Sequence, residues 1–272
     1  CYMGGCESLR GDANGEPFCQ EGLSIFQEVG DQRGIALALR GLAWVALHQG
    51  DYPLAKQRFQ DSLALFREVC DQKQITLSLS GLGYTCFILG EYQASKQHHE
   101  EMLALCKEIG DQGGIARSLG DLGIDTYALR DYKQAQELWL ASLALYREIG
   151  DQWGIADVLG SLGEGAIALG EYAQAAQFAQ QGRYAFAKLA PQMDSWELRV
   201  LGNAALGVGD LQTARTYLRQ SLEQALKVRR WRDALNTLVV IAALLAKEGK
   251  EDQAIELLAL VMGHRAGSQM AR

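Results

Sequence analysis

The sequence has few residues that interrupt helices and no long hydrophobic run. Only three prolines occur in 272 residues, so little in the chain would break a helix from within. No stretch reaches the roughly 18 uninterrupted apolar residues that mark a membrane helix, and we expect no membrane partner. An excess of positive charge is also absent, because 26 basic residues stand against 33 acidic ones, for a net charge of -7. This balance argues against direct binding of nucleic acid, which requires a basic face.

Motifs that carry chemistry are missing as well. The sequence has no G-x-x-x-x-G-K-[ST] loop, no G-x-S-x-G turn and no H-E-x-x-H pair, which would mark nucleotide, acyl-transfer and zinc sites. His98 and His99 are adjacent, so on a helix their rings point about 100° apart and are poorly placed to share a metal. We therefore expect no enzymatic activity, no catalytic residues, no metal and no cofactor.

The cysteines show no pairing pattern. Six of them occur, at positions 1, 6, 19, 70, 86 and 106, without a C-x-x-C pair. This spacing favours reduced thiols in a cytoplasmic protein, with Cys70, Cys86 and Cys106 acting as small hydrophobic residues. A disulfide or metal role for Cys1, Cys6 and Cys19 is the alternative. The sequence begins with Cys1 rather than Met, and we expect it to be part of a longer protein.

What the chain does have is a period of 40 residues. The same short segment recurs as Gly30-Asp31-Gln32, Cys70-Asp71-Gln72, Gly110-Asp111-Gln112 and Gly150-Asp151-Gln152. A fixed period of this length indicates one supersecondary unit repeated in an array. The period therefore predicts a solenoid or array, and we expect the function to lie in a surface rather than in a catalytic motif.

Each repeat contains two segments with apolar residues three and four apart, which is typical of helices. The first helices are predicted at 34–48, 74–88, 114–128 and 154–168, and the second helices at 52–69, 92–109, 132–149 and 172–188. Glycine at the turns supplies a left-handed C-cap, and the Asp or Glu that follows caps the next helix. Gly83, Gly123, Gly163 and Gly202 recur in mid-helix, which predicts that a neighbouring helix packs closely there.

The array is irregular at two places. The period slips to 39 near Pro191, where residues 190–196 replace the usual turn. Residues 16–29 match the second helix of a repeat, and residues 1–15 read as a loose or degenerate segment. We therefore predict a loose segment over 1–15 and a repeat array over 16–272, with an irregular turn near 190–196.

The repeat resembles the tetratricopeptide repeat. The best-matching copy contains Leu122-Gly123, Asp131-Tyr132, Ala135, Trp139 and Ser142. The period is 40 residues instead of the usual 34 or so, because both helices are longer. The resemblance implies an all-α, right-handed superhelical solenoid of about six antiparallel helix pairs. Long copies with strong mutual similarity also resemble the sensor arms of bacterial STAND-class signal-transduction ATPases and transcriptional regulators.

In that family the first helices line a concave groove, and the register assigns its positions in this chain. These positions differ between copies while the packing positions repeat. The candidate binding residues are Arg40, Trp44, His48, Tyr84, Phe87, Arg117, Ile124, Tyr127, Asp157, Glu164, Trp196, Arg199 and Asn203. Aromatic and arginine side chains are typical binding hot spots, with Arg40 and Arg117 as candidate anion clamps. Unselected variation on a solvent face is one alternative, and partial burial of each aromatic or arginine residue against the neighbouring second helix is the other.

Two functions are consistent with these observations. The first is a non-catalytic binding module, whose partner is a protein or peptide, another domain of its own parent chain, or a small ligand. It would be the C-terminal sensor domain of a STAND-type regulator. The second is a structural scaffold that self-associates, for example as a homodimer through its end repeats, because the apolar faces at the ends of a repeat array tend to pair.

Overall fold

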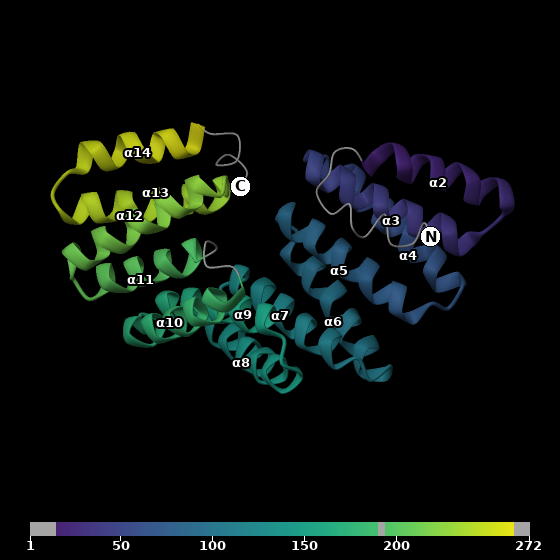
Figure 1. Ribbon diagram of the computed structural model, residues 1–272, viewed down its shortest axis with the longest axis horizontal. Coiled ribbons are helices and arrows are strands. Elements are labelled where there is room, and N and C mark those ends of the chain that lie inside the picture. Colours follow the sequence, from purple (N-terminus) through teal and green to yellow (C-terminus); the bar gives the residue numbers. More distant parts are fainter. Residues whose placement is uncertain (1–14, 190–193, 264–272) are drawn as a thin grey trace. The chain divides into compact units, whose positions relative to one another are not determined.

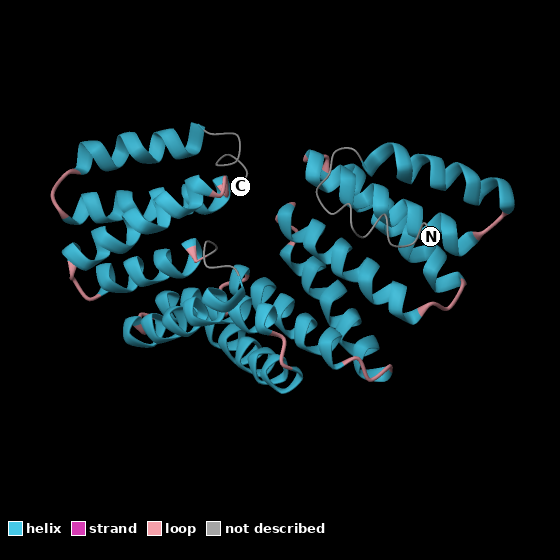
Figure 2. Ribbon diagram, in the orientation of Figure 1, coloured by secondary structure: helices cyan, strands magenta, loops and turns pink. Residues whose placement is uncertain are grey.

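The computed structural model describes residues 15–189 and 194–263. Within these ranges it contains thirteen helices and no strand (Figures 1 and 2). The chain forms two compact units, residues 1–129 and 130–272. Unit 1 holds α2 (Gly15–Val29), α3 (Gln32–Gln49), α4 (Tyr52–Glu68), α5 (Gln72–Ile88), α6 (Tyr92–Glu108) and α7 (Gln112–Ala128). Unit 2 holds α8 (Tyr132–Ile149), α9 (Gln152–Ala168), α10 (Tyr172–Leu189), α11 (Ser195–Gly207), α12 (Leu211–Lys227), α13 (Trp231–Lys247) and α14 (Glu251–Gly263).

Successive helices pack as antiparallel pairs within each unit. In unit 1, α3 packs on α4 and α5 on α6, and the first helices α3, α5 and α7 also contact one another in sequence. Unit 2 repeats the arrangement with α9 on α10, α11 on α12 and α13 on α14, while α11 touches both α9 and α13. The predicted all-α solenoid of helix pairs is confirmed. The division into residues 1–15 and 16–272 stays a prediction, and residues 1–14 and 190–193 lie outside the described residues.

The Asp after each turn begins the next helix. The Asp31 side chain accepts a hydrogen bond from the Gly34 backbone at 3.0 Å, and Asp111 accepts one from Gly114 at 2.9 Å. Since the cap is the Asp itself, the first helices α3, α5, α7 and α9 begin at the Gln that follows it, two residues before the predicted start. Glu91 does not behave as predicted, because its longer side chain makes no capping bond and pairs with Lys56 instead.

Left-handed backbone at the turns explains most of the recurring glycines. Gly30, Gly50 and Gly110 have φ of 71°, 82° and 72°. Three non-glycine residues occupy equivalent turns, namely Cys70 (φ 54°), Arg130 (φ 67°) and Arg229 (φ 56°). A side chain in this region costs about 1–2 kcal/mol, so these three turns carry strain that their siblings avoid.

Replacing Cys70 by glycine is therefore expected to stabilise the protein by about 1 kcal/mol. Cys70 is an exposed free cysteine, so its thiol makes no buried contact that would be lost. The increase should appear as a higher urea midpoint in equilibrium unfolding. Gly110→Ala, at the equivalent turn of the next repeat (φ 72°), should lower the midpoint by a similar amount. An unchanged or lower midpoint for Cys70→Gly would show that the turn carries no strain.

The mid-helix glycines allow close helix packing, as the sequence predicts. A Cβ on Gly163 would lie 2.8 Å from Val200, and one on Gly202 would lie 2.6 Å from Leu218. At Gly83 it would overlap the imidazole of His99. The prediction is thus confirmed at three of the four positions, and each glycine admits one bulky side chain from a neighbouring helix.

Cys70, Cys86 and Cys106 are free thiols, and Cys19, Cys86 and Cys106 are buried. Burial raises the pKa of the Cys86 thiol to about 11, which keeps it protonated and unreactive. The expectation that Cys70 acts as a small hydrophobic residue is wrong, because Cys70 occupies an exposed turn. Cys1 and Cys6 lie outside the described residues. None of the described helices is long and apolar enough to span a membrane.

Candidate functional site

In unit 1 the predicted binding residues lie on α3, α5 and α7. Arg40 is buried, and its Nη1 donates to Oε1 of Gln74 at 2.5 Å while the guanidinium carbon lies 5.5 Å from the centre of the Phe66 ring. These contacts tie α3 to the helices that follow it. In this position Arg40 is part of the packing, as the partial-burial alternative expects.

The aromatic residues of this face are partly exposed. Trp44 is half-buried and meets Phe59 edge-on, with ring centroids 5.3 Å apart. Phe87 is half-buried and packs against Tyr92 at 5.3 Å. Tyr84 leaves 41% of its surface exposed. Trp44 and Phe87 are therefore held by packing against neighbouring rings, and all three aromatic side chains leave part of their surface exposed to a partner.

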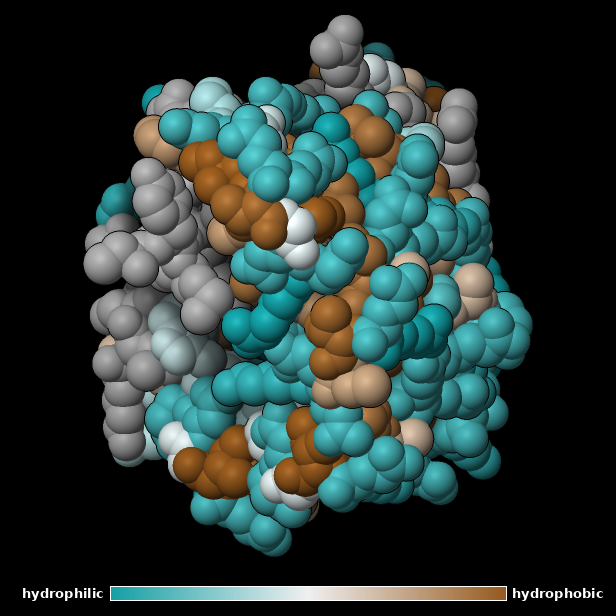
Figure 3. Space-filling view, turned by 90° about the vertical axis from the view of Figure 1, so that its right-hand side faces the viewer, coloured by the Kyte–Doolittle hydropathy of each residue, from teal (hydrophilic) through white to brown (hydrophobic). Residues whose placement is uncertain are grey.

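Polar and aliphatic residues complete the face. His48 is exposed on α3 and lies near Trp44, with ring centroids 6.5 Å apart. On α7, Arg117 is exposed, while Ile124 and Tyr127 are half-buried. We call the eight predicted residues on α3, α5 and α7 the unit 1 face. On the side of the molecule seen in Figure 3, hydrophobic residues form separate patches among hydrophilic ones.

In unit 2 the structure joins three of the predicted residues. Glu164 on α9 accepts a hydrogen bond from Nε1 of Trp196 at 2.9 Å and pairs with Nη1 of Arg199 at 2.6 Å. The Trp196 ring packs over Gly160, where a Cβ would lie 2.9 Å from it. Asp157 is exposed on α9 and Asn203 is half-buried on α11. The sequence identified these positions but not the bonds among them.

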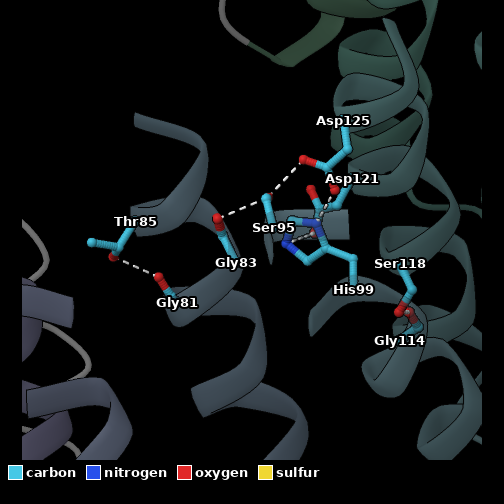
Figure 4. A network of polar contacts seen from close by, with 9 residues as sticks. All are labelled: Gly81, Gly83, Thr85, Ser95, His99, Gly114, Ser118, Asp121 and Asp125. Atoms are coloured by element: carbon cyan, nitrogen blue, oxygen red, sulfur yellow. Dashed lines mark hydrogen bonds and ion pairs between the residues drawn. The ribbon is translucent and has the colours of Figure 1, made fainter. Parts of the chain in front are cut away.

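A buried polar cluster in unit 1 was missed by the sequence analysis (Figure 4). Nδ1 of His99 on α6 lies 2.6 Å from Oδ2 of Asp125 on α7, and both side chains are almost fully buried. The Ser95 hydroxyl lies 2.6 Å from Oδ1 of Asp125 and 2.9 Å from the Gly83 carbonyl. With a single proton, it donates to one of them at a time. We call Ser95, His99 and Asp125 the buried cluster.

The residue types of the buried cluster are those of a hydrolase triad, but the geometry differs. A triad needs the hydroxyl bonded to the imidazole and the imidazole bonded to the carboxylate. Here Ser95 and His99 both bond to Asp125 and not to each other. No group of three or more metal-binding side chains occurs among the described residues. The buried cluster therefore links α5, α6 and α7 and has no nucleophile–base pair.

The two adjacent histidines differ in pKa. Burial lowers the pKa of His98. Burial acts in the same direction on His99, but the hydrogen bond to Asp125 and the nearby charge of Asp121 outweigh it and raise the pKa of His99 above its ordinary value. Asp121 lies 4.0 Å from Nε2 of His99.

Unit 2 contains a second buried ionisable group that the sequence analysis missed. Glu197 on α11 is fully buried, and neither oxygen of its side chain has a hydrogen-bond partner. Burial raises the pKa of this carboxyl to about 8. The register gives a signal that could have found it, because the sibling repeats carry small or aliphatic buried residues here, namely Ala38, Ser78, Ser118 and Val158.

Comparison with known proteins agrees with this architecture. The tetratricopeptide repeat model matches residues 1–68 and 74–138. The apo form of RapI is 17% identical, with a TM-score of 0.77 over 91% of this chain and 88% of that one. A Rap protein complexed with competence and sporulation factor is also 17% identical, with a TM-score of 0.71 over 90% and 68%.

A third similar structure is the Rap conjugation gene regulator of the plasmid pLS20 in complex with the Phr* peptide. It is 11% identical, with a TM-score of 0.72 over 88% of this chain and 66% of that one. No curated protein sequence matches the chain. The first half of the chain thus matches a tetratricopeptide repeat model by sequence, and the described residues have the fold of proteins built from such repeats.

Proposed function

We propose that the chain is a non-catalytic binding module that holds a peptide or protein segment on the unit 1 face. The observation that carries this proposal is the row of partly exposed aromatic residues on three neighbouring first helices, with the exposed Arg117 beside them. Aromatic and arginine side chains supply much of the energy of protein interfaces. Two structures of the same fold contain a bound partner, competence and sporulation factor in one and the Phr* peptide in the other, which supports a peptide as the partner.

The repeats themselves support a more specific role for this binding module. Their 40-residue period and mutual similarity support a sensor domain in a cytoplasmic STAND-type NTPase regulator. In such a protein, a ligand that binds one state more tightly shifts the equilibrium of the nucleotide switch. Asp157, Glu164, Trp196, Arg199 and Asn203 remain candidate binding residues of unit 2. There the pairing of Glu164 with Arg199 holds two of these side chains in a fixed geometry.

The unit 1 face can be tested with a random twelve-residue peptide library displayed on phage and selected on the full chain. Peptides that the wild type selects should bind Tyr84→Ala about 30-fold more weakly, as expected for a hot spot worth roughly 2 kcal/mol. Trp44→Ala should have a similar effect, although it also removes a contact with Phe59. Thermal unfolding monitored by circular dichroism separates loss of binding from loss of structure.

A matched control is Leu140→Ala. Leu140 is 44% exposed, close to the 41% of Tyr84, but it lies on the second helix α8. This variant should bind the selected peptides as the wild type does. Equal binding by the wild type, Tyr84→Ala and Trp44→Ala would rule out the unit 1 face as the binding surface.

Self-association through the end repeats is a second candidate, because the first and last of the described helices expose hydrophobic side chains. On α2, Phe18 and Val29 are 57% and 69% exposed, and on α14, Ile255 and Leu260 are 65% and 66% exposed. Exposed apolar patches of this kind mark interaction sites. Light scattering between about 1 and 100 µM should then show a mass that rises toward the dimer, and Leu260→Glu should reduce it. A constant monomer mass would contradict self-association.

A further inference from the structure

A hollow of about 510 Å³ opens on unit 2, and none of its lining residues is a predicted binding residue. It lies where the end of α8, the first half of α9 and the middle of α10 meet. Ile155 and Leu159 form an apolar floor, and glutamines of α9 and α10 line the sides. Its walls are thus mainly second helices, whereas the unit 1 face is built from first helices.

Comparison between repeats shows why the hollow exists. Ala185 lines it, at a register where α4, α6 and α8 carry Leu65, Leu105 and Leu145. Two of those leucines, Leu65 and Leu105, pack against the core of unit 1. Ala185 lacks the outer carbon atoms of those leucines, and this leaves space beside α10. The preceding position differs as well, because Tyr184 replaces an alanine found in α4, α6 and α8 and is 68% exposed at the rim.

The charge of the hollow also departs from the repeat. In unit 1, Nη2 of Arg67 pairs with the Glu101 carboxylate on the next second helix at 2.5 Å, a separation of 34 residues. Arg147 is its counterpart in the hollow, but 34 residues further on it meets the neutral Gln181 at 3.2 Å. Arg147 is the one charged residue among those described as lining the hollow. Its positive charge therefore favours an anionic group in the site.

The lining matches the chemistry of a peptide. Glutamine side chains donate and accept hydrogen bonds as backbone amides do. Two exposed aromatic residues flank the site, Tyr184 and the 49% exposed Trp153, whose ring meets Phe186 edge-on at 5.8 Å. Phe186 belongs to the same small core as Ala185 and Ile155. A rigid aromatic and apolar surface therefore lies beside an arginine, and these are the residue types that dominate peptide interfaces.

We propose that this hollow is a second binding site, which takes a peptide segment with an acidic residue next to an aliphatic one. The aliphatic side chain enters the space above Ile155 and Leu159, and the carboxylate pairs with Arg147. The peptide backbone bonds to the glutamine amides. The site goes beyond the proposed function of the unit 1 face, since it uses different helices, which belong to the other unit.

The test is selection of a random twelve-residue peptide library on the full chain carrying Tyr84→Ala and Arg117→Ala. Both residues are exposed, so these substitutions disable the unit 1 face and leave unit 2 unchanged. The selected peptides should be enriched in Asp or Glu beside Leu, Ile or Val. Their affinity should fall at least tenfold with Ala185→Leu, which restores the leucine of the sibling repeats and fills the hollow. Arg147→Gln should cost about tenfold, as expected for loss of a charge-assisted bond.

Two controls keep the outcome clear. Ala187→Leu adds the same atoms at an exposed position of α10 that does not line the hollow, and it should leave the affinity unchanged. Circular dichroism should show that Ala185→Leu unfolds at or above the wild-type temperature. The proposal is overturned if the disabled chain selects no peptide, or if its peptides bind Ala185→Leu and the parent equally. Failure of the unit 1 face appears separately, as wild-type peptides that Tyr84→Ala does not weaken.

Discussion

Replacing Glu197 by glutamine is expected to raise the free energy of unfolding of unit 2 by about 3 kcal/mol at pH 7. The pKa of this buried carboxyl is about 8, against an ordinary value of 4.5. At pH 7 the folded protein keeps the group protonated, whereas the unfolded chain ionises it. Between the ordinary pKa and the folded pKa, each pH unit lowers the free energy of unfolding by about 1.4 kcal/mol. Glutamine has the shape of the protonated side chain and does not ionise.

The surroundings of Glu197 explain the size of the shift. Burial is the largest cause, and the neighbouring carboxylates Asp194 and Asp157 raise the pKa further. The Glu197 backbone and the Arg230 charge act in the opposite direction, but too weakly to offset burial. Asp194 is itself paired with Arg183 at 2.9 Å. The carboxyl thus lies among groups that oppose its ionisation, without a hydrogen bond of its own.

The sign of the pH dependence follows from the raised pKa. The folded state binds a proton that the unfolded state releases, so stability is greatest below about pH 4.5 and falls until the pH passes about 8. Urea unfolding at pH 5, 7 and 9, followed by tryptophan fluorescence, measures this slope. Glu197→Gln should flatten it, whereas Glu148→Gln at an exposed site should change stability by less than about 0.5 kcal/mol. An equal slope in wild type and Glu197→Gln would disprove the assignment.

The fold could be predicted because its determinants are local and repeated. The Gly-Asp turn needs a left-handed residue and a capping carboxylate, and both are visible in the sequence at most periods. Close helix contacts at Gly83, Gly163 and Gly202 were predictable for the same reason, since a costly mid-helix glycine recurs only where a side chain would clash.

The binding residues were harder to predict, because exposure depends on three-dimensional neighbours. Arg40 was predicted as an anion clamp, yet the adjacent Gln74 and Phe66 hold its guanidinium in the packing. Trp196 and Arg199 belong to the repeat after that of Glu164, and only the folded arrangement brings this carboxylate to both. A period identifies variable positions but does not show which of them bind each other.

The buried polar residues were missed because each one differs from its sibling residues at a separate position of the repeat. Ser95 stands at a position where the siblings carry alanine, and His99 stands where two siblings carry aromatic residues, namely Phe59 and Trp139. Asp125 takes the place of Val45, Thr85 and Gly165. Three polar substitutions at core positions on neighbouring helices suggest mutual contact, since an isolated buried charge is very costly. A search for coupled departures from the repeat would have found the buried cluster.

Replacing Asp125 by alanine is expected to destabilise unit 1 by about 3–5 kcal/mol, because it leaves a buried His99 without its carboxylate partner. The Ser95 hydroxyl also loses an acceptor and keeps only the Gly83 carbonyl. Ser118→Ala on the same helix is a suitable comparison, because that hydroxyl bonds to a backbone carbonyl within α7 at 2.8 Å. It should cost about 1 kcal/mol in urea unfolding.

The charge of Asp125 can be separated from its shape with Asp125→Asn and a nuclear magnetic resonance titration of the imidazoles. In the wild type, His98 should titrate below the ordinary pKa of 6.5 and its neighbour His99 above it. Asparagine keeps an acceptor for His99 but removes the charge, so the pKa of His99 should fall while that of His98 changes little.

The raised pKa of His99 also fixes how the buried cluster responds to pH. Its contribution to stability is fully present below about pH 6.5, the ordinary value, and is lost as the pH rises through the folded pKa. Since Glu197 gives a slope of the same sign, Asp125→Asn should be compared with its parent in a Glu197→Gln background. There the loss of stability that His99 causes as the pH rises above about 6.5 should disappear with Asp125→Asn. If His99 titrates at or below 6.5 in the wild type, Asp125 does not hold His99 in its charged form.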